Sequence, residues 1–268
     1  MKMSIISEEI EDIEFDEPFG EFEFENQKYP FWGNPEGRNK TVDYDLGKFN
    51  RYAKIGVVAN ELIEKLKHNI KKDIGGINGR CSFACLIMMK YGIRIGNEDS
   101  AMGYASGLED NEGEVVQTYG TTTLLNKHIK VQENKLSLDF LGKTQVEQHV
   151  DIDDPFVIEH AGKYYKPEEP EEKWLGIDYD MLFSFVKSEV GDAFIPKDFR
   201  TFCANVTGWK AVKSFLDKPK KEKKSEVNAE VKTITEIVAS KLGNTPSIAK
   251  RAYIDNRMLD WFKSERLK

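Results

Sequence analysis

The sequence has few of the residues that build disulfide frameworks, metal centres or nucleotide-binding loops. Its three cysteines, Cys81, Cys85 and Cys203, are an odd set without framework spacing, which is typical of free thiols in a reducing compartment. Cys81 and Cys85 lie four residues apart in an apolar stretch, and no second ligand pair follows, so we interpret them as core residues. No glycine-rich phosphate loop is present, and the four histidines are scattered. We therefore expect neither a metal ion nor a nucleotide cofactor.

The chain also lacks a long apolar run. No stretch of about eighteen apolar residues occurs, so no membrane-spanning helix is predicted. The short apolar patch at the N-terminus is followed by acidic residues and has no cleavage-site pattern, so a secretion signal is not expected. With 40% hydrophobic and 32% charged residues, the 268-residue chain has the composition of a soluble globular protein with one or two domains.

An excess of positive charge is missing as well, because the formal net charge is -7. The charge is unevenly distributed. The first 25 residues hold ten acidic side chains and one basic side chain, Lys2, so the rest of the chain is slightly positive. Runs of acidic residues are usually solvated and unstructured. The sequence therefore predicts a near-neutral body that carries an acidic N-terminal arm.

Helical periodicity dominates the chain on both sides of one β-rich region. Apolar residues recur at helical intervals from Phe49 to Ile70, and a more apolar helix is expected from Phe83 to Tyr91. Residues 20–32 alternate acidic and aromatic side chains and predict one short strand. Further amphipathic helices are expected at Tyr179–Val190 and Lys197–Gly208.

The β-rich region is predicted to be a set of antiparallel strands joined by tight turns. Glu133-Asn134 separates two strand-like segments, and Gly142-Lys143-Thr144 separates the second from a third. Lys143 is therefore expected at or near a hairpin tip. Together with the flanking helices, these strands predict an α+β fold that is mainly helical and contains a small antiparallel sheet.

The C-terminal part is predicted to be a charged linker followed by two helices. Residues 218–228 have no apolar face and form the linker. The apolar stripe from Val231 to Leu242 indicates the first helix, and Gly243 suits its end. A final helix is expected from Ala249 to Phe262, with Pro246 near its start.

The segment LGNTPSIAKRAYI, residues 242–254, resembles the active-site tyrosine segment of the type IB DNA topoisomerases. That family shows Gly-His-Thr-Pro or Gly-Asn-Thr-Pro, then a basic pair, then the tyrosine, which here is Tyr253. Three further segments follow in the family's order: IRIGNEDSA contains Arg94, LDFLGK ends in Lys143, and PKDFRTFCANV contains Arg200. The resemblance covers the chain from about Asp45 to the C-terminus.

The resemblance implies an enzyme that nicks and reseals duplex DNA. Tyr253 would attack a phosphodiester, release a 5′-hydroxyl and form a 3′-phosphotyrosyl bond, which retains the bond energy so that resealing needs no ATP. Lys143 would act as the general acid for the leaving oxygen. Arg94 and Arg200 would clamp the non-bridging oxygens, and Asn244 would donate a neutral hydrogen bond to the same phosphate.

Five other residues are candidate DNA contacts. Lys197 precedes Arg200 by three residues, at a position that is often basic in the family. Lys127 and His128 lie beside the predicted strands, and Lys250 and Arg251 precede the tyrosine. All five side chains are also compatible with an ordinary solvent-exposed surface.

The resemblance also implies a domain division and a set of partners. Residues 1–44 would be an acidic N-terminal arm or a reduced N-terminal β domain, and residues 45–268 would be the catalytic domain, with the linker before its C-terminal tyrosine-bearing helices. A further hypothesis is that the arm occupies the DNA channel as a mimic. The expected partner is double-stranded DNA bound by a monomer, without a cofactor or membrane. The expected location is cytoplasmic and nucleoid-associated, or viral.

Two alternatives remain. A site-specific tyrosine recombinase or integrase would share the fold and the arginine, lysine, arginine and tyrosine set. Recombinases usually carry histidine three residues before the second arginine and His-Thr or His-Ser after it, where this chain has Lys197 and Thr201-Phe202. The other alternative is a DNA-binding module that has lost catalysis, and the joint presence of all four residues argues against it.

Overall fold

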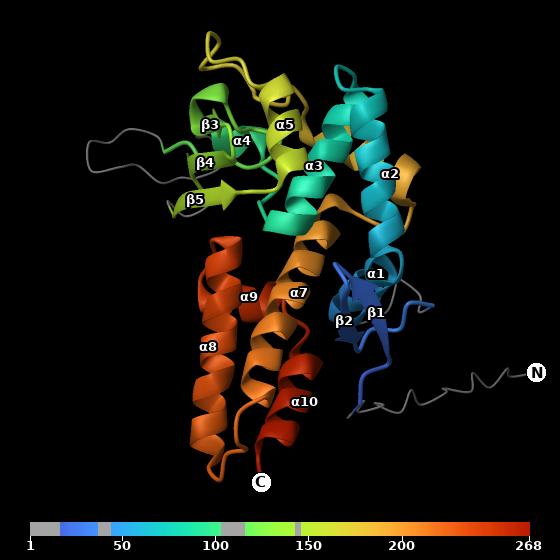
Figure 1. The fold of residues 1–268 in the computed structure, drawn as a ribbon, viewed down its shortest axis with the longest axis vertical. Coiled ribbons are helices and arrows are strands. Elements are labelled where there is room, and N and C mark those ends of the chain that lie inside the picture. Colours follow the sequence, from blue (N-terminus) through green and yellow to red (C-terminus); the bar gives the residue numbers. More distant parts are fainter. Residues whose placement is uncertain (1–16, 37–43, 103–115, 143–145) are drawn as a thin grey trace, which may run out of the picture.

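The computed structural model describes residues 17–36, 44–102, 116–142 and 146–268. Within these ranges, helices surround one two-stranded and one three-stranded antiparallel sheet, which confirms the predicted α+β, mainly helical class. The long helix α7 (Pro196–Leu216) connects two regions of the molecule (Figure 1). We call the part that contains the three-stranded sheet and helices α1–α6 the sheet region, and helices α8–α10 the C-terminal helices. None of the described helices is long and apolar enough to cross a membrane.

The sheet region contains most of the secondary structure, and its elements follow one another along the chain. They are α1 (Tyr44–Val57), α2 (Ala59–Lys72), α3 (Ile77–Tyr91), α4 (Glu98–Ala101), η1 (Asn126–His128), β3 (Ile129–Gln132), β4 (Lys135–Leu141), β5 (Glu147–Ile152), α5 (Pro155–Tyr164), α6 (Tyr179–Phe185) and the π-helical turn η3 (Val186–Val190). The C-terminal helices are α8 (Lys224–Leu242), α9 (Pro246–Ala252) and α10 (Asn256–Arg266).

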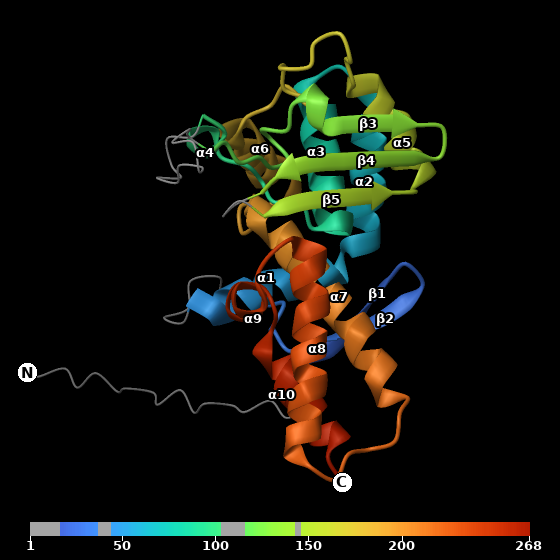
Figure 2. The same cartoon turned by 90° about the vertical axis from the view of Figure 1, so that its left-hand side faces the viewer.

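Helix α3 lies at the centre of the sheet region because it is apolar on nearly every face. Ten of its residues are buried, among them Cys81 and Cys85, which confirms their interpretation as core residues. The sheet has the order β3-β4-β5 and packs with one face toward the helices (Figure 2). The turn at Glu133-Asn134 joins β3 to β4, as predicted.

Residues 20–32 form a hairpin and not the single strand that the alternation predicts. Strands β1 (Gly20–Phe24) and β2 (Gln27–Phe31) pair antiparallel around Glu25 and Asn26, whose φ angles of 49° and 59° are those of a tight two-residue turn. Phe22 is buried against Tyr52 of α1 and Phe202 of α7, so the hairpin contributes to the main core. The division of the chain at residue 44 stays a prediction.

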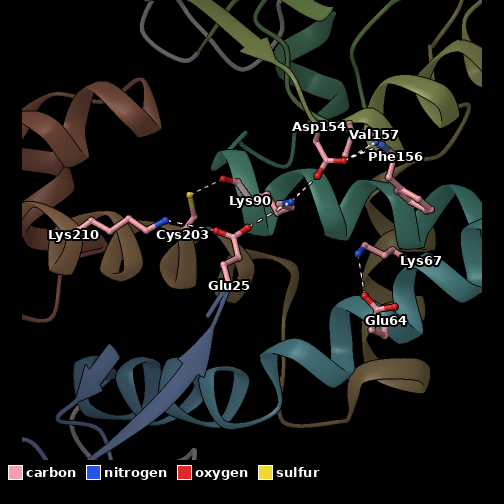
Figure 3. A network of polar contacts seen from close by, with 9 residues as sticks. All are labelled: Glu25, Glu64, Lys67, Lys90, Asp154, Phe156, Val157, Cys203 and Lys210. Carbon is pink, nitrogen blue, oxygen red and sulfur yellow. Dashed lines mark hydrogen bonds and ion pairs between the residues drawn. The ribbon is translucent and has the colours of Figure 1, made fainter. Parts of the chain in front are cut away.

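Charged side chains also attach the hairpin to two helices. The carboxylate of Glu25 lies 3.5 Å from Lys90 Nζ at the end of α3 and 3.6 Å from Lys210 Nζ on α7. Lys90 also pairs with Asp154, the residue that caps α5, at 2.6 Å (Figure 3). The turn therefore contacts the sheet region and α7 together.

Several helix boundaries differ from the predictions, and α3 and α7 are both longer than expected. The helix expected through Phe49–Ile70 is two helices that are separated at Val58, a half-exposed residue with non-helical backbone angles. The final helix is also two helices, because Asp255 caps a new one through the backbone N–H of Arg257. The predicted linker at 218–228 is shorter, since α8 begins at Lys224 and already buries Val227.

Candidate active site

The first arginine lies in the segment that follows α3. The helix ends at Gly92, and the backbone of Arg94 and Ile95 then pairs with the segment Thr118–Thr123: the Thr121 N–H donates to the Arg94 carbonyl at 2.7 Å. The Thr121 hydroxyl donates to the same carbonyl at 2.9 Å. A Cβ on Gly120 would lie 2.7 Å from that oxygen, so this close approach requires glycine. Arg94 is thus fixed through its backbone.

The second arginine, Arg200, joins the two regions of the molecule. It lies on α7 with only 4% of its surface exposed. Its Nη1 donates to the carbonyl of Gly92 at the end of α3, and its Nη2 donates to the carbonyl of Leu242 at the end of α8, both at 2.5 Å. Carbonyl groups at a helix C-terminus lack helical partners and carry partial negative charge, so a guanidinium suits both ends.

The start of α7 is held in turn by a buried ion pair. Pro196 occupies the first turn, and the carboxylate of Asp198 accepts hydrogen bonds from the Ile195 N–H and from Arg51 Nε, both at 2.9 Å. Burial raises the pKa of Asp198, and Arg51 opposes this shift. The helix turn that carries Lys197 and Arg200 is therefore anchored to α1.

Asn244 follows the end of α8 in a Schellman motif. Gly243 takes the left-handed conformation with φ 58°, its N–H donates to Ser240, and the Asn244 N–H donates to Ala239. Thr245 then caps α9 through the N–H of Ile248, with Pro246 next to it. Gly-Asn-Thr-Pro is therefore a helix stop followed directly by a helix start, with the asparagine side chain between them.

Tyr253 lies in the break between α9 and α10. The Asn205 side-chain amide on α7 donates to the Tyr253 carbonyl at 2.9 Å and accepts from the Asp255 N–H at 2.8 Å. The tyrosine ring lies 5.1 Å from Arg200 Cζ and 5.3 Å from Lys197 Nζ. Sequence reasoning missed Asn205, because an asparagine inside a helix gives no signal of the backbone that it binds.

These side chains line one cleft of about 300 Å³ between the sheet region and the C-terminal helices. Arg94, Arg200, Asn244, Tyr253 and Lys197 all contribute to its wall. Arg94 Nη1, Arg200 Nε and Asn244 Nδ2 are buried and have no hydrogen-bond partner among the described residues. Burial and the neighbouring Arg200 lower the pKa of Arg94. Buried donors without partners are rare, so this cluster is suited to an anion.

Lys143 falls outside the described residues, so its predicted place at a hairpin tip stays a prediction. Its neighbour Gly142 lines the same cleft, and the Gly142 N–H donates to the carbonyl of Val146, just before β5, at 2.8 Å. Among the described residues, no group of three His, Cys, Asp or Glu side chains could hold a metal ion.

The remaining candidate contacts do not line this cleft. Lys127 pairs with Glu171 at 2.6 Å, and burial lowers the pKa of His128 to about 4. His128 lies with its ring 4.3 Å from that of Tyr119 and accepts a hydrogen bond from the Leu125 N–H. Lys250 and Arg251 are exposed on α9. A DNA contact of any of these four residues stays a prediction.

The fold defines the class first: a mainly helical α+β catalytic domain of the topoisomerase IB and tyrosine recombinase type. Comparison with known proteins then gives the family. The model of the family "Eukaryotic DNA topoisomerase I, catalytic core" matches residues 38–265. The chain therefore belongs to the type IB DNA topoisomerases, a family of isomerases, and this membership implies DNA as its partner.

Relatives from large DNA viruses agree with the family. The chain is 29% identical to DNA topoisomerase 1B of Vaccinia virus (strain Copenhagen) over 247 residues, which cover 88% of this chain and 69% of the relative. It is 29% identical to DNA topoisomerase I of Monkeypox virus over 212 residues (75% and 59%). It is 24% identical to DNA topoisomerase 1B of Acanthamoeba polyphaga mimivirus over 160 residues (55% and 48%).

Proposed function

We propose that this chain relaxes supercoiled duplex DNA by cutting one strand through Tyr253 and resealing it, without ATP or a metal ion. The convergence of three unpartnered buried donors on the cleft that contains the tyrosine ring is the observation that carries the proposal. Each donor is a residue that the sequence resemblance assigns to phosphate binding, although Arg94 comes from a loop, Arg200 from near the start of α7 and Asn244 from the turn after α8.

The cleft favours a phosphodiester for electrostatic reasons. Two guanidinium groups remain charged at neutral pH and can bind the non-bridging oxygens, while the Asn244 amide adds a neutral donor. The donors are already fixed by backbone contacts before the substrate binds, so they need not reorganise as negative charge develops on the phosphate. Preorganised donors of this kind supply a large share of transition-state stabilisation.

In the proposed reaction, Tyr253 Oη gives its proton to solvent water and forms a bond to phosphorus while the bond to the 5′-oxygen breaks. Lys143 gives a proton to that oxygen, which leaves as a hydroxyl. Rotation of the free end changes the linking number, and attack of the hydroxyl on the phosphotyrosyl bond then restores the strand and the tyrosine. Because the protein–DNA bond stores the energy of the phosphodiester, no nucleotide is consumed.

The test is relaxation of supercoiled plasmid in EDTA without ATP, with wild type beside Tyr253→Phe. We expect relaxation by the wild type alone, and a covalent protein–DNA adduct when the reaction is stopped with denaturant. Relaxation by Tyr253→Phe at the wild-type rate would overturn the role of the tyrosine. Joining of two duplexes at a defined site by the wild type would support a recombinase in its place.

We also propose that the protein acts as a monomer and that it is viral in origin or associated with bacterial DNA. The viral relatives support the first of these sources. Sedimentation with and without a short duplex tests the monomer, and a mass equal to two chains on one duplex would contradict it.

A further inference from the structure

A second cleft adjoins the catalytic one at the end of α8. It is lined by Val146, by Glu147–Asp151 of β5, by Ala239–Lys241 at the end of α8 and by the Gly243-Asn244 turn. The two clefts share six lining residues: Tyr91, Gln148, Val150, Lys241, Gly243 and Asn244. They therefore form one groove that continues from the tyrosine past Asn244 toward the edge of the sheet.

Lys241 is the cation among these shared residues. It lies in the last turn of α8, three residues before Asn244, and is exposed. Its Nζ lies 5.2 Å from the centroid of the Tyr91 ring, and no carboxylate of the described residues lies within ion-pairing distance. By contrast, Lys232 on the same helix pairs with Glu236 at 3.8 Å and lines neither cleft.

The opposite wall of the second cleft carries two carboxylates. Glu147 and Asp151 of β5 line it together with His149. Asp151 pairs with Lys135 at 2.6 Å and lies 3.2 Å from His149, so Glu147 supplies most of the repulsive charge. A DNA strand that leaves the catalytic cleft in this direction would meet these carboxylates, and like charges at short range repel. Among the described residues, Lys241 is the only lysine or arginine that lines this cleft, and it stands on the side of the groove that leads back to Asn244.

We propose that Lys241 binds the DNA phosphate next to the one attacked by Tyr253, and that the acidic β5 wall keeps the strand on the Lys241 side of the groove. This inference rests on the proposed function, because it places a second phosphate beside the one in the catalytic cleft. The two walls meet at Gly243: a Cβ there would lie 1.6 Å from Gln148 Oε1, so the amide of Gln148 lies directly against this left-handed turn.

The test measures duplex binding by the Tyr253→Phe protein, so that its outcome does not depend on cleavage. In fluorescence anisotropy from 50 to 200 mM salt, Lys241→Gln should weaken binding about tenfold at the lowest salt and reduce the slope of log affinity against log salt by about 0.9, the value for one phosphate contact. Glu147→Gln should strengthen binding, because it removes a repulsive charge. Lys232→Gln is the matched control and should change neither quantity.

The competing explanation is that Lys241 only stabilises the end of α8. In that case Lys241→Gln would lower the melting temperature of the free protein and leave the salt slope equal to that of Lys232→Gln, which would overturn the proposal. Recovery of the slope by Lys241→Arg would support it. If wild type fails to cleave DNA but Lys241→Gln reduces the slope of log affinity against log salt as expected, the proposed reaction is wrong and the phosphate contact of Lys241 is supported.

Discussion

The two walls of the catalytic cleft are built in different ways. The sheet region holds Arg94 by pairing its backbone with the Thr118–Thr123 segment, inside the larger of the two apolar cores. The C-terminal helices form a smaller core together with Trp32 and part of α7, and they hold Asn244 and Tyr253 at helix ends. Arg200 bonds to both walls. The sheet region therefore holds Arg94 on a rigid platform. The positions of Asn244 and Tyr253, by contrast, depend on where the C-terminal helices end and begin.

The two arginines therefore differ in what their side chains contribute to stability, although the proposed reaction uses both for the same phosphate. The Arg200 guanidinium bonds to two carbonyls, and one of its nitrogens is left for the phosphate. For Arg94, burial and the nearby Arg200 lower the pKa, so the folded protein disfavours its charge. In the proposed reaction, Arg200 would thus serve both stability and chemistry, while Arg94 would serve chemistry at a cost in stability.

The largest expected effect comes from replacing each arginine by glutamine. Both changes should slow cleavage about 100- to 1,000-fold, because each removes a preorganised donor. Arg200→Gln should also lower the free energy of unfolding by about 2 kcal/mol, since it leaves helix-end carbonyls unpaired. Arg94→Gln should leave the melting temperature equal or raise it. Single-turnover cleavage and thermal denaturation measure the two effects, and equal losses of stability would contradict the difference between the walls.

Asn205→Ala tests how the tyrosine is positioned. The change removes the bonds to the Tyr253 carbonyl and the Asp255 N–H, so we expect a loss of about 1–3 kcal/mol in stability and slower cleavage at a temperature where the variant is fully folded. Thr235→Val is the matched control, because this buried hydroxyl bonds only within α8. If the two variants cleave at equal rates, Asn205 has no positioning role.

The sequence predicts which residues share this cleft better than where the helices begin and end. The segments around Arg94, Arg200 and Tyr253 could be identified because their residue types and order resemble those of the family. The break after Tyr253 could not be predicted, because an apolar pattern continues through it and Asp255 gives only a weak capping signal. In the same way, Val58 fits the helical spacing although the chain bends there.

Long-range contacts account for what was missed. Asn205 and the Tyr253 backbone are 48 residues apart, and Arg200 and Gly92 are 108 apart, so no local pattern can reveal these bonds. The β1–β2 hairpin was underestimated for a related reason. Its Glu25-Asn26 turn lacks the glycine that usually marks such turns, and its aromatic face is explained only by the α1 and α7 residues that cover it.

A smaller effect is expected at Asn244, in the turn that follows the end of α8. Asparagine cannot titrate near neutral pH, so the contribution of Asn244 to cleavage should not vary with proton concentration there. Asn244→His places a group with a pKa near 6.5 at the same point, and its cleavage rate should change between about pH 5.5 and 7.5 relative to wild type. Single-turnover rates across this range give the comparison. Parallel loss of rate in both proteins below pH 6 would refute the prediction.

The smallest expected effect lies at His149 on β5, in the wall of the second cleft and outside the cleft that Arg94 and Arg200 line. The ring of His149 on β5 contacts the carboxylate of Asp139 through Nδ1 and lies 3.2 Å from Asp151 through Nε2. Hydrogen bonds that the ring N–H groups donate to these carboxylates raise the pKa of His149, so the folded state favours the protonated ring.

A group with a raised pKa in the folded state contributes stability below its unfolded pKa and loses that contribution as the pH rises through the folded value. The melting temperature of wild type should therefore fall relative to His149→Gln as the pH rises from about 6.5. The difference should be small, because the pair is exposed and screened by solvent. Thermal denaturation of both proteins at pH 5.5, 7 and 8.5 measures it. A difference that does not change with pH would show that the sheet face, like the platform around Arg94, is held by its backbone and not by this histidine.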